Sequence, residues 1–383
     1  MPLLPAFTFQ TATEIVFGRG KAAMAPVRVA GLGRAVFLVH GATASRADWL
    51  AQALGALGCR VLRHAVAREP DLAMIEAATN AARGFGAVVV VSLGGGAVID
   101  TGKAVAAMVP ATRPLMDHLE VVGRGLPLDQ PPLPFVALPT TAGTGAEVTR
   151  NAVIGVPDHR RKVSLRDARM LPRLAIIDPA LTDHTTRGIT LASGLDAVTQ
   201  VIEPYISARA NPLTDALCRD AIPAGLAALQ RLMLAEDAGA RDQLAWVSLC
   251  GGLALANAGL GVVHGLAGPL GGLADAPHGA ICGALLPHGL ARNRLRVTDP
   301  DRALRIEQVV TWIGAGFAVP TDQALTTMAT WSRRNGLPGL GAMGISAADC
   351  DAAAMAAQSA SSMQANPVVL DLADLQAILT AAM

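Results

Sequence analysis

The sequence predicts an α/β domain with a parallel sheet, followed by an all-helical domain. Up to about Pro179, short β-branched runs alternate with Ala-rich stretches of helical character, which is typical of a parallel sheet covered by helices. Beyond that residue the β signal fades, and Ala/Leu-rich segments at helical spacing continue to Met383. We therefore expect an α/β domain at residues 1–183 and a helical domain at residues 184–383.

Length and composition support two well-packed globular domains. The chain has 383 residues, which exceeds the size at which one hydrophobic core usually keeps growing. It is 52% hydrophobic, 16% charged and only 3% aromatic, with a formal net charge of +1. Few aromatic side chains and no basic excess argue against binding of nucleic acid, which needs stacking surfaces and phosphate-neutralising charge.

The first twenty residues lack a basic start followed by an apolar core, and no uninterrupted apolar run reaches the roughly 18 residues that span a bilayer. The cysteines are odd in number and widely spread, with no Cys-x-x-Cys pair. This distribution favours reduced thiols rather than a disulfide framework. We expect a cytoplasmic protein with no membrane partner.

Three strands stand out in the first half. Ala35–Val39 is apolar throughout and Ala87–Leu93 is apolar except for Ser92, as expected of strands covered on both faces. Pro134–Leu138 is a third strand that runs directly into a Thr/Gly-rich loop. Loops after parallel strands meet at one edge of the sheet, which is where such folds bind ligands.

Long amphipathic segments predict the helices of the second half. Leu213–Met233, Arg241–Ala258 and Ala347–Met363 are each bounded by Gly, Pro, Asn or Asp, which are typical helix starts and stops. No repeat or low-complexity linker separates the two halves. We expect them to pack tightly, with a cleft between them.

A triple-glycine turn follows the second strand and opens a helix at Gly94-Gly95-Gly96-Ala97. Glycines let the backbone approach a ligand closely, and the amides and dipole of a helix start favour a pyrophosphate. A tight turn without a ligand is the alternative for this loop alone.

The third strand is followed by hydroxyl side chains and glycines between Pro139 and Thr149. The hydroxyl groups can hydrogen-bond ribose and phosphate, or they can simply satisfy the backbone of their own turn. Two such loops together indicate a nucleotide-binding domain of Rossmann-like type.

A second group of residues has the character of a metal site. Asp196 and Gln200 are four residues apart in a helical stretch and share one face. His264 and His278 stand in Gly-rich helical segments that can bring the two imidazoles together. One carboxylate and two imidazoles with open positions are typical of a catalytic metal ion. A lone histidine is more often structural, and we assign the other histidines to structural or surface positions.

These motifs together resemble the iron-containing, or group III, alcohol dehydrogenase family, with glycerol dehydrogenase-like and maleylacetate reductase-like relatives. The matching residues are Ile15 to Gly20, the triple-glycine loop with Asp100 and Lys103, the Pro139-to-Thr149 loop, Asp178-Pro179, Asp196, His264 and Pro277-His278-Gly279. The resemblance implies the dehydroquinate synthase-like fold, an active site between the domains, and a homodimer or larger homo-oligomer.

The resemblance also implies the cofactors and their residues. It implies NAD or NADP together with one divalent metal, Fe²⁺ or Zn²⁺, bound by Asp196, His264 and His278 as the catalytic residues, with Gln200 at a fourth ligand position. The cofactor residues implied by motif are Gly41, Gly94, Gly95, Gly96, Ala97, Asp100, Thr140, Thr141, Thr144, Thr149, Asn151 and Lys162.

The chain departs from the family pattern at three positions. Gln200 and Gly268 stand where the iron-type pattern has His, and Ala97 replaces the usual Ser. An amide oxygen binds divalent metals more weakly than imidazole, so the metal affinity and identity are affected most. Backbone amides still serve the phosphate at Ala97.

The function implied is hydride transfer between a nicotinamide cofactor and a small alcohol or its aldehyde or ketone. Two alternatives share the fold: reduction of an unsaturated keto acid, as in maleylacetate reductase, and a dehydroquinate synthase-like lyase reaction. A nucleotide-binding protein with a catalytically weakened metal site is a third.

Cofactor choice depends on the end of the first strand. NAD-preferring members of the family commonly carry an Asp there, which binds the adenosine ribose and repels a 2′-phosphate. Gly41 occupies this position, and Thr43, Ser45 and Arg46 follow it. We expect NADP to be accepted, although Arg46 facing solvent at the next helix start is the alternative.

Overall fold

The computed structural model describes residues 6–274 and 276–383, and the chain divides into two compact units. An α/β unit comprises residues 11–141 and 146–183, and a helical unit contains residues 184–383 with two short segments, 6–10 and 142–145. Hydrogen bonds between Gln10 and Asn257 attach the first segment to the helical unit. In the second, an added Cβ at Gly145 would lie 2.5 Å from Gly252, so its backbone packs directly on a helix.

The α/β unit is built on a six-stranded sheet with the order β1-β8-β5-β4-β2-β3. Every neighbouring pair is parallel, so the carboxyl ends of all six strands lie along one edge. The order reverses direction between β2 and β4, and parallel sheets bind ligands at such a switch point. The strands are β1 (Ile15–Phe17), β2 (Ala35–Gly41), β3 (Arg60–Val66), β4 (Val89–Gly94), β5 (Phe135–Pro139) and β8 (Leu174–Ile177).

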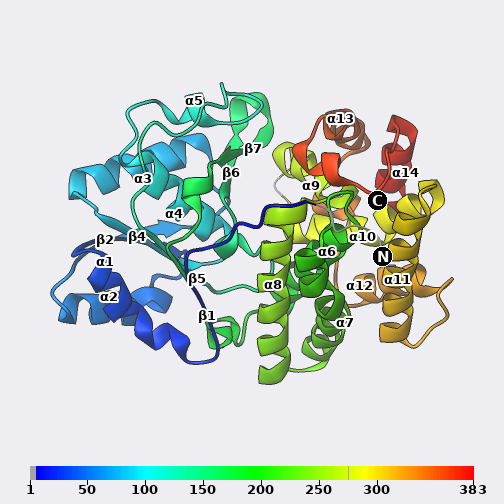
Figure 1. The fold of residues 1–383 in the computed structure, drawn as a ribbon, viewed down its shortest axis with the longest axis horizontal. Coiled ribbons are helices and arrows are strands. Elements are labelled where there is room, and N and C mark those ends of the chain that lie inside the picture. The colour runs from blue at the N-terminus through cyan, green and yellow to red at the C-terminus, as the bar shows by residue number, and fades with distance from the viewer. Residues whose placement is uncertain (1–5, 275) are drawn as a thin grey trace. The chain divides into compact units, whose positions relative to one another are not determined.

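Helices cover both faces of this sheet, as continuously apolar strands require (Figure 1). On one face, Val36 and Leu38 of β2 pack with α1 (Ala25–Leu32) and α2 (Asp48–Ala56). On the other, Phe37 packs in a second core. The helices of that core are α3 (Leu72–Phe85) and α4 (Gly96–Met108). The prediction of a parallel sheet buried between helices is therefore confirmed.

An antiparallel hairpin, which the sequence analysis did not predict, adds to this unit. Its strands are β6 (Asn151–Val156) and β7 (Arg161–Arg166). One face is apolar, where Ile154 and Leu165 pack in a third core with residues of α4. The short helix α5 (Leu115–His118) contributes to the same core.

The resemblance marker Asp178 has a structural role. Its buried carboxylate accepts hydrogen bonds from the amides of Gly20, Ala22 and Ala180, at 3.0, 2.8 and 3.0 Å. One side chain therefore fixes both the loop after β1 and the segment after β8.

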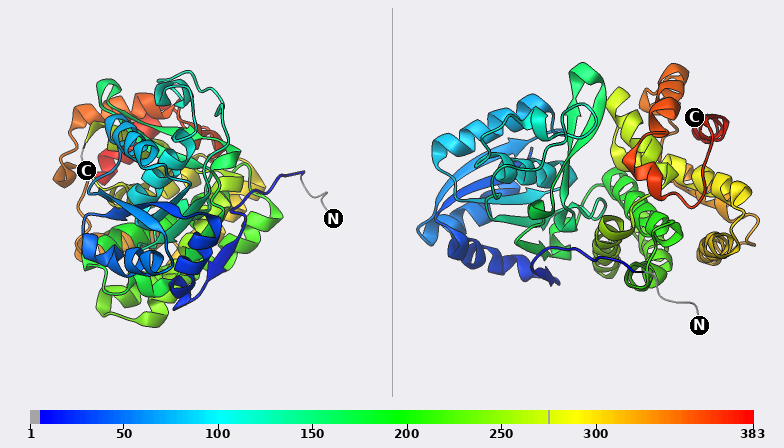
Figure 2. Two further views of the ribbon diagram at one scale, coloured as in Figure 1. Left: turned by 90° about the vertical axis from the view of Figure 1, so that its left-hand side faces the viewer. Right: turned by 45° about the horizontal axis from the view of Figure 1, so that its top comes forward.

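The second unit is helical, as predicted, and Figure 2 shows its helices in two further views. The predicted helices at Leu213 and Arg241 are observed with nearly the same bounds, whereas the one predicted for Ala347–Met363 ends at Ala357, before a Ser-rich stretch. The helices are α6 (Arg187–Ile206), α7 (Pro212–Leu234), α8 (Ala238–Ala258), α9 (Val262–Leu273), α10 (His278–Arg296), α11 (Pro300–Phe317), α12 (Ala324–Arg334), α13 (Ala347–Ala357) and α14 (Leu372–Ala382).

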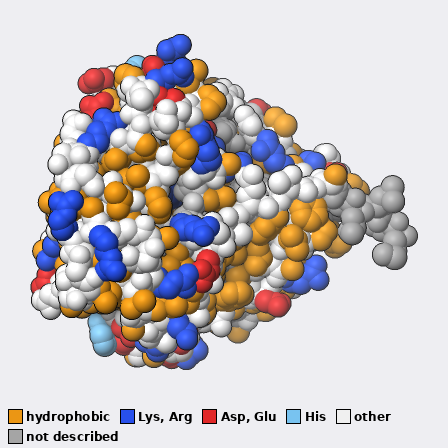
Figure 3. Space-filling model, turned by 60° about the vertical axis from the view of Figure 1, so that its left-hand side comes forward, with side chains coloured by type: hydrophobic (Ala, Val, Ile, Leu, Met, Phe, Trp, Pro, Cys, Tyr) orange, Lys and Arg blue, Asp and Glu red, His pale blue; other side chains and the backbone are white. Residues whose placement is uncertain are grey.

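In the described part of the chain, no single helix is both long and apolar enough to cross a membrane. Helices α8 and α9 have the necessary length and apolar character only when taken together, and the chain bends by 97° between them. Figure 3 shows Lys and Arg side chains standing apart from one another on the face that it presents, among hydrophobic and uncharged ones. All five cysteines are buried and free.

Candidate metal and cofactor sites

Helix α6 presents three polar side chains to the interior of the helical unit. Asp196, Gln200 and Glu203 follow one another at intervals of four and three residues, which places them on one face. All three are buried. Buried carboxylates need partners, because desolvation of an unpaired charge is costly.

Glu203 finds its partners at the start of α9. Its carboxylate accepts hydrogen bonds from the amide of Val263 at 2.7 Å and from the imidazole Nδ1 of His264 at 2.6 Å. The carboxylate therefore satisfies an amide that the helix start leaves unpaired, and it orients the imidazole. A carboxylate that accepts from one ring nitrogen leaves the other nitrogen as a lone-pair donor, which is the arrangement found behind metal-bound histidines.

The free nitrogen of His264 faces a second acceptor. Its Nε2 lies 3.3 Å from Oδ1 of Asp196, and neither atom has a hydrogen-bond partner. Oε1 of Gln200 is also buried without a partner. Buried acceptors are nearly always satisfied, so a cluster of unpartnered ones fits a bound cation.

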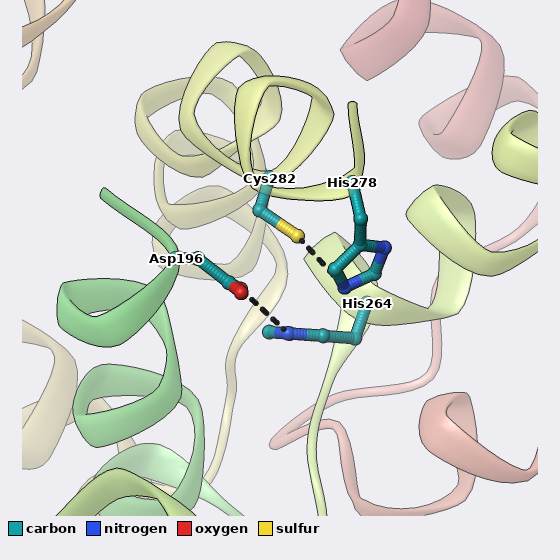
Figure 4. A group of neighbouring side chains, drawn as sticks. All are labelled: Asp196, His264, His278 and Cys282. Atoms are coloured by element: carbon teal, nitrogen blue, oxygen red, sulfur yellow. Dashed lines mark hydrogen bonds and ion pairs between the residues drawn. The ribbon is translucent and has the colours of Figure 1, made fainter. Parts of the chain in front are cut away.

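Helix α10 completes the cluster with His278, its first residue, and Cys282, one turn later. The sulfur of Cys282 lies 3.6 Å from Nε2 of His278. Figure 4 shows these side chains and those of Asp196 and His264 pointing toward one another from three helices. One ligand atom from each of the four lies within 4.8 Å of the others. The four side chains are therefore close enough together to hold one ion.

Glycines bring α10 close to α6. A Cβ at Gly279 would lie 2.5 Å from the carbonyl oxygen of Ala192, and a Cβ at Gly283 would lie 2.6 Å from the side chain of Leu195. Only a residue without a side chain fits at such a distance. The backbone of α10 therefore contacts α6 beside Asp196, which explains how residues from different helices reach one point.

The potential in the cluster favours positive charge. Burial alone would lower the pKa of His278, but the sulfur of Cys282 and the carboxylate of Asp196 raise it to about 9. Burial likewise opposes a charged His264, yet Cys282, Asp196 and Glu203 raise its pKa well above the usual value. For Asp196, burial would raise the pKa, and the two imidazoles and the Gln200 amide lower it. The cluster therefore favours positive charge, which protons on the imidazoles or a bound cation can supply.

Sequence reasoning missed two members of this site. Glu203 lies seven residues after Asp196, so helical spacing from the predicted ligand could have identified it. Cys282 lies four residues after His278 and could have been found in the same way. Gly268 stands where the family pattern has His. A Cβ built on this glycine meets no atom within 4 Å, so the position opens into free space.

The predicted phosphate loop lies at the carboxyl end of β4. Strand β4 ends at Gly94, Gly95 caps the next helix, and α4 begins at Gly96. A Cβ at Gly94 would lie 2.5 Å from the side chain of Val98, so the turn requires glycine. The first amides of α4, with that of Ala97 among them, lie at the positive end of the helix dipole and form a candidate anion site. The loop fits a pyrophosphate.

The Thr-rich loop lies beside this turn. The amide of Thr140 donates to the carbonyl of Gly94 at 3.0 Å, and the hydroxyl of Thr141 would lie 3.2 Å from a Cβ at Gly95. The structure therefore brings Thr140 and Thr141 to the glycine turn. Thr144 lies in the segment that belongs to the helical unit.

A buried lysine organises the remaining residues of the predicted cofactor set. Lys103 donates to the hydroxyl and carbonyl of Thr149, at 2.8 and 3.1 Å, and to the carbonyl of Asn151 at 2.6 Å. Asp100 accepts from the amide of Val153 at 3.1 Å. Burial lowers the pKa of Lys103 to about 8, although nearby Asp100 and Glu147 raise it. The Asp and Lys of the motif thus fasten the β6–β7 hairpin to α4.

The last two of the predicted cofactor residues are Lys162 and Gly41. Lys162 on β7 forms an ion pair with Glu69. Gly41 ends β2 on the sheet edge that carries Gly94, and a Cβ built on it meets no atom within 4 Å. Thr43, Ser45 and Arg46 follow it with exposed side chains.

Comparison with known proteins identifies the family of the chain. Residues 12–179 match the family model for iron-containing alcohol dehydrogenase, and residues 190–383 match that for the C-terminal part of the same family. The NAD-dependent methanol dehydrogenase of Bacillus methanolicus is 31% identical over 76% of this chain and 75% of its own length. Lactaldehyde reductase of Escherichia coli (strain K12) is 32% identical over 81% of each chain.

Solved structures extend the match to the fold. The crystal structure of a 1,3-propanediol oxidoreductase has a TM-score of 0.89 and 28% identity, covering 99% of this chain and 100% of the other. An alcohol dehydrogenase from Oenococcus oeni has a TM-score of 0.86 and 28% identity, with coverage of 99% and 100%. The chain therefore belongs to the iron-containing alcohol dehydrogenase family, as an oxidoreductase that interconverts an alcohol and its carbonyl compound.

Proposed function

We propose that Asp196, His264 and His278 hold one divalent metal ion and that the chain uses it to transfer hydride between NAD(P) and a small primary alcohol or aldehyde. The observation that carries the proposal is the pair of buried, unpartnered acceptors, Oδ1 of Asp196 and Nε2 of His264, at 3.3 Å. Two acceptors at this distance need a cation or a proton between them.

Each residue of the site has a definite task. When bound, the metal polarises the substrate oxygen as a Lewis acid, and the nicotinamide takes or gives the hydride. Asp196 supplies a negative ligand that offsets part of the ion's charge. Glu203 keeps His264 in the tautomer that presents Nε2. His278 is less deeply buried than Asp196 and His264, which leaves its side of the cluster accessible to a small substrate.

The α/β unit supplies the cofactor site in this proposal. The first amides of α4 bind the pyrophosphate, and Thr140 and Thr141 hydrogen-bond it or the adjacent ribose. The buried ammonium group of Lys103 holds Thr149 and Asn151 in place through hydrogen bonds. Gly41 has no carboxylate that would repel the 2′-phosphate of NADP, and Arg46 has a positive charge that attracts it. We therefore propose that NADP is accepted alongside NAD.

The metal in this proposal is Fe²⁺ or Zn²⁺. Gln200 is a neutral amide at the fourth ligand position, where the family resemblance has an imidazole. An amide binds divalent metals more weakly, so the preference of the site for iron is weaker than with the iron-type ligand set. Its unpartnered Oε1 and its place beside Asp196 support a position next to the ion.

The substrate class rests on the relatives. Those named as methanol dehydrogenase, 1,3-propanediol dehydrogenase and lactaldehyde reductase all act on a terminal alcohol or aldehyde group. We therefore propose a short primary alcohol and its aldehyde as the substrate pair. We also propose a homodimer or larger homo-oligomer, which light scattering measures directly.

Replacement of His278 by Ala tests the metal site. We expect the variant to lose both the bound ion and turnover, by more than about 1000-fold in kcat/KM, because the ion supplies several kcal/mol of stabilisation. Elemental analysis and cofactor reduction, measured with a panel of short alcohols after loading with iron or zinc, provide the two readouts. His288→Ala, on the same helix but outside the cluster, is the control and should keep both. Unchanged metal content in His278→Ala would show that the assignment is wrong.

A further inference from the structure

The strongest feature that the proposed function leaves unused is the thiol of Cys282. We propose that Cys282 binds the metal as a thiolate, so that the site is an Asp, His, His and Cys set that prefers zinc to iron. This inference rests on the metal site of the proposed function and names the fourth ligand, which the family resemblance places at Gln200 instead.

Distances within the cluster support a thiolate ligand. A tetrahedral zinc ion with sulfur at about 2.3 Å and nitrogen at about 2.0 Å separates these two ligand atoms by roughly 3.5 Å. The sulfur of Cys282 lies 3.6 Å from Nε2 of His278. A nitrogen and a carboxylate oxygen on the same ion are roughly 3.4 Å apart. Nε2 of His264 and Oδ1 of Asp196 are 3.3 Å apart.

The directions of the side chains agree with the distances. In Figure 4 the sulfur of Cys282 points toward the imidazoles and the carboxylate, not along the surface of its helix. His278 and Cys282 occupy successive turns of α10, a spacing at which two side chains share one face. Gly283, the next residue, packs against Leu195 of α6, so the turn that carries Cys282 is held beside Asp196.

Charge balance favours the thiolate over the amide of Gln200. Two negative ligands balance the charge of a divalent ion in a poorly solvated site, where unbalanced charge is costly. Asp196 provides one, and Glu203 provides no ligand atom, because its carboxylate lies behind His264 and accepts from that imidazole and from the start of α9. Gln200 is neutral, whereas a deprotonated Cys282 provides the second negative charge.

The other cysteines lack such surroundings. Cys218 and Cys250 are buried, and among the described residues only Cys282 belongs to a cluster of metal-binding side chains. A thiolate is a soft ligand that suits zinc, whereas carboxylate and imidazole alone serve many divalent ions. Zinc can expand to five ligands during catalysis, and in that state a four-residue set accommodates a substrate oxygen.

The experiment uses Co²⁺ as a spectroscopic substitute for zinc in the full-length, metal-free protein. Coordination to a thiolate produces an intense near-ultraviolet charge-transfer band, which carboxylate and imidazole ligands do not give. We expect this band in the wild type and in Gln200→Ala, and we expect Cys282→Ser to bind Co²⁺ without it. Competition with a chelator should show zinc affinity lower by about 10- to 100-fold in Cys282→Ser, and a preference shifted toward Fe²⁺.

Controls separate this inference from the proposed function. Cys250→Ala, another buried thiol of the helical unit, should keep the band. A wild-type protein that binds Co²⁺ without the band, or a band that survives in Cys282→Ser, overturns the role of Cys282 and leaves the metal site standing. A wild-type protein that takes up no Co²⁺ at all overturns the proposed metal site and this inference together.

Discussion

The two candidate sites of this chain are built in opposite ways. In the helical unit, the metal cluster consists of side chains from three helices: Asp196, His264, and His278 with Cys282. In the α/β unit, the phosphate site is a backbone turn, in which Gly94 has no room for a side chain and the amides of α4 provide the donors. One site depends on which side chains are present and the other on where the main chain runs.

This difference explains which departures from the family pattern matter. Ala97 for Ser leaves the backbone amides unchanged, so the phosphate site keeps its donors. Gln200 stands where the family resemblance has a metal-binding imidazole, so we expect this departure to alter the chemistry of the proposed site. We expect substitutions in the metal cluster to change metal binding strongly and substitutions around the loops to change cofactor choice or stability more mildly.

Glu203→Gln should have the largest of the effects compared here. The amide keeps an oxygen for the Val263 amide but loses the charge that fixes the His264 tautomer. We expect metal affinity to fall by about 10- to 100-fold, the usual cost of removing a carboxylate behind a metal-bound histidine. Chelator competition measures the affinity, and circular dichroism checks that the fold is intact. Equal affinity in the two proteins would contradict this role for Glu203.

Gln200→His should act in the opposite direction. An imidazole added beside Asp196 supplies a stronger ligand than the amide, so metal retention against a chelator should improve on the order of tenfold, or 1.4 kcal/mol. The rate of metal loss from loaded protein is the measurement. Retention that does not change would indicate that position 200 does not face the ion.

Gly41→Asp should change cofactor choice without touching the metal. The structure leaves space for the new side chain at the end of β2, where a carboxylate can bind the ribose and repel a 2′-phosphate. The ratio of kcat/KM values should shift toward NAD by about tenfold, or 1.4 kcal/mol. Gly84→Asp, on the exposed side of α3, adds the same charge away from the loops and serves as the control. A ratio that stays constant in Gly41→Asp, or one that moves equally in both variants, would argue against this account.

Glu147→Gln should affect only the pH dependence of stability. Burial raises the pKa of Glu147 from 4.5 to about 7, although Lys103 lowers it. Between these values the folded protein binds more protons than the unfolded chain, so stability falls as pH rises through this window. The variant lacks this titration and should lose less stability between pH 4.5 and pH 7, with a difference on the order of 1 kcal/mol. Thermal unfolding at several pH values tests it, and parallel curves for the two proteins would refute it.

The sequence predicted the framework well because the framework follows periodicity. Apolar runs identified β2, β4 and β5, and helical spacing identified α7 and α8. The β6–β7 hairpin escaped detection because β7 carries three basic residues and β6 contains Asn151 and Gly155, so that both segments look like loops. Glu203 shares a helix face with Asp196, which sequence spacing could have indicated, but its contact with His264, 61 residues away, could not be read from the sequence. Cys282 resembled a core residue of an apolar helix. The roles of the predicted site residues remain predictions.

The close contact between α10 and α6 has a consequence for how the chain acquires its metal. Gly279 and Gly283 set the separation of these helices through backbone and apolar contacts, which need no ion. For the proposed metal site, we expect these contacts to keep the ligand side chains together with or without an ion, so that binding requires no rearrangement of α6 and α10. We therefore expect the proposed site to exchange one divalent ion for another without unfolding of the chain.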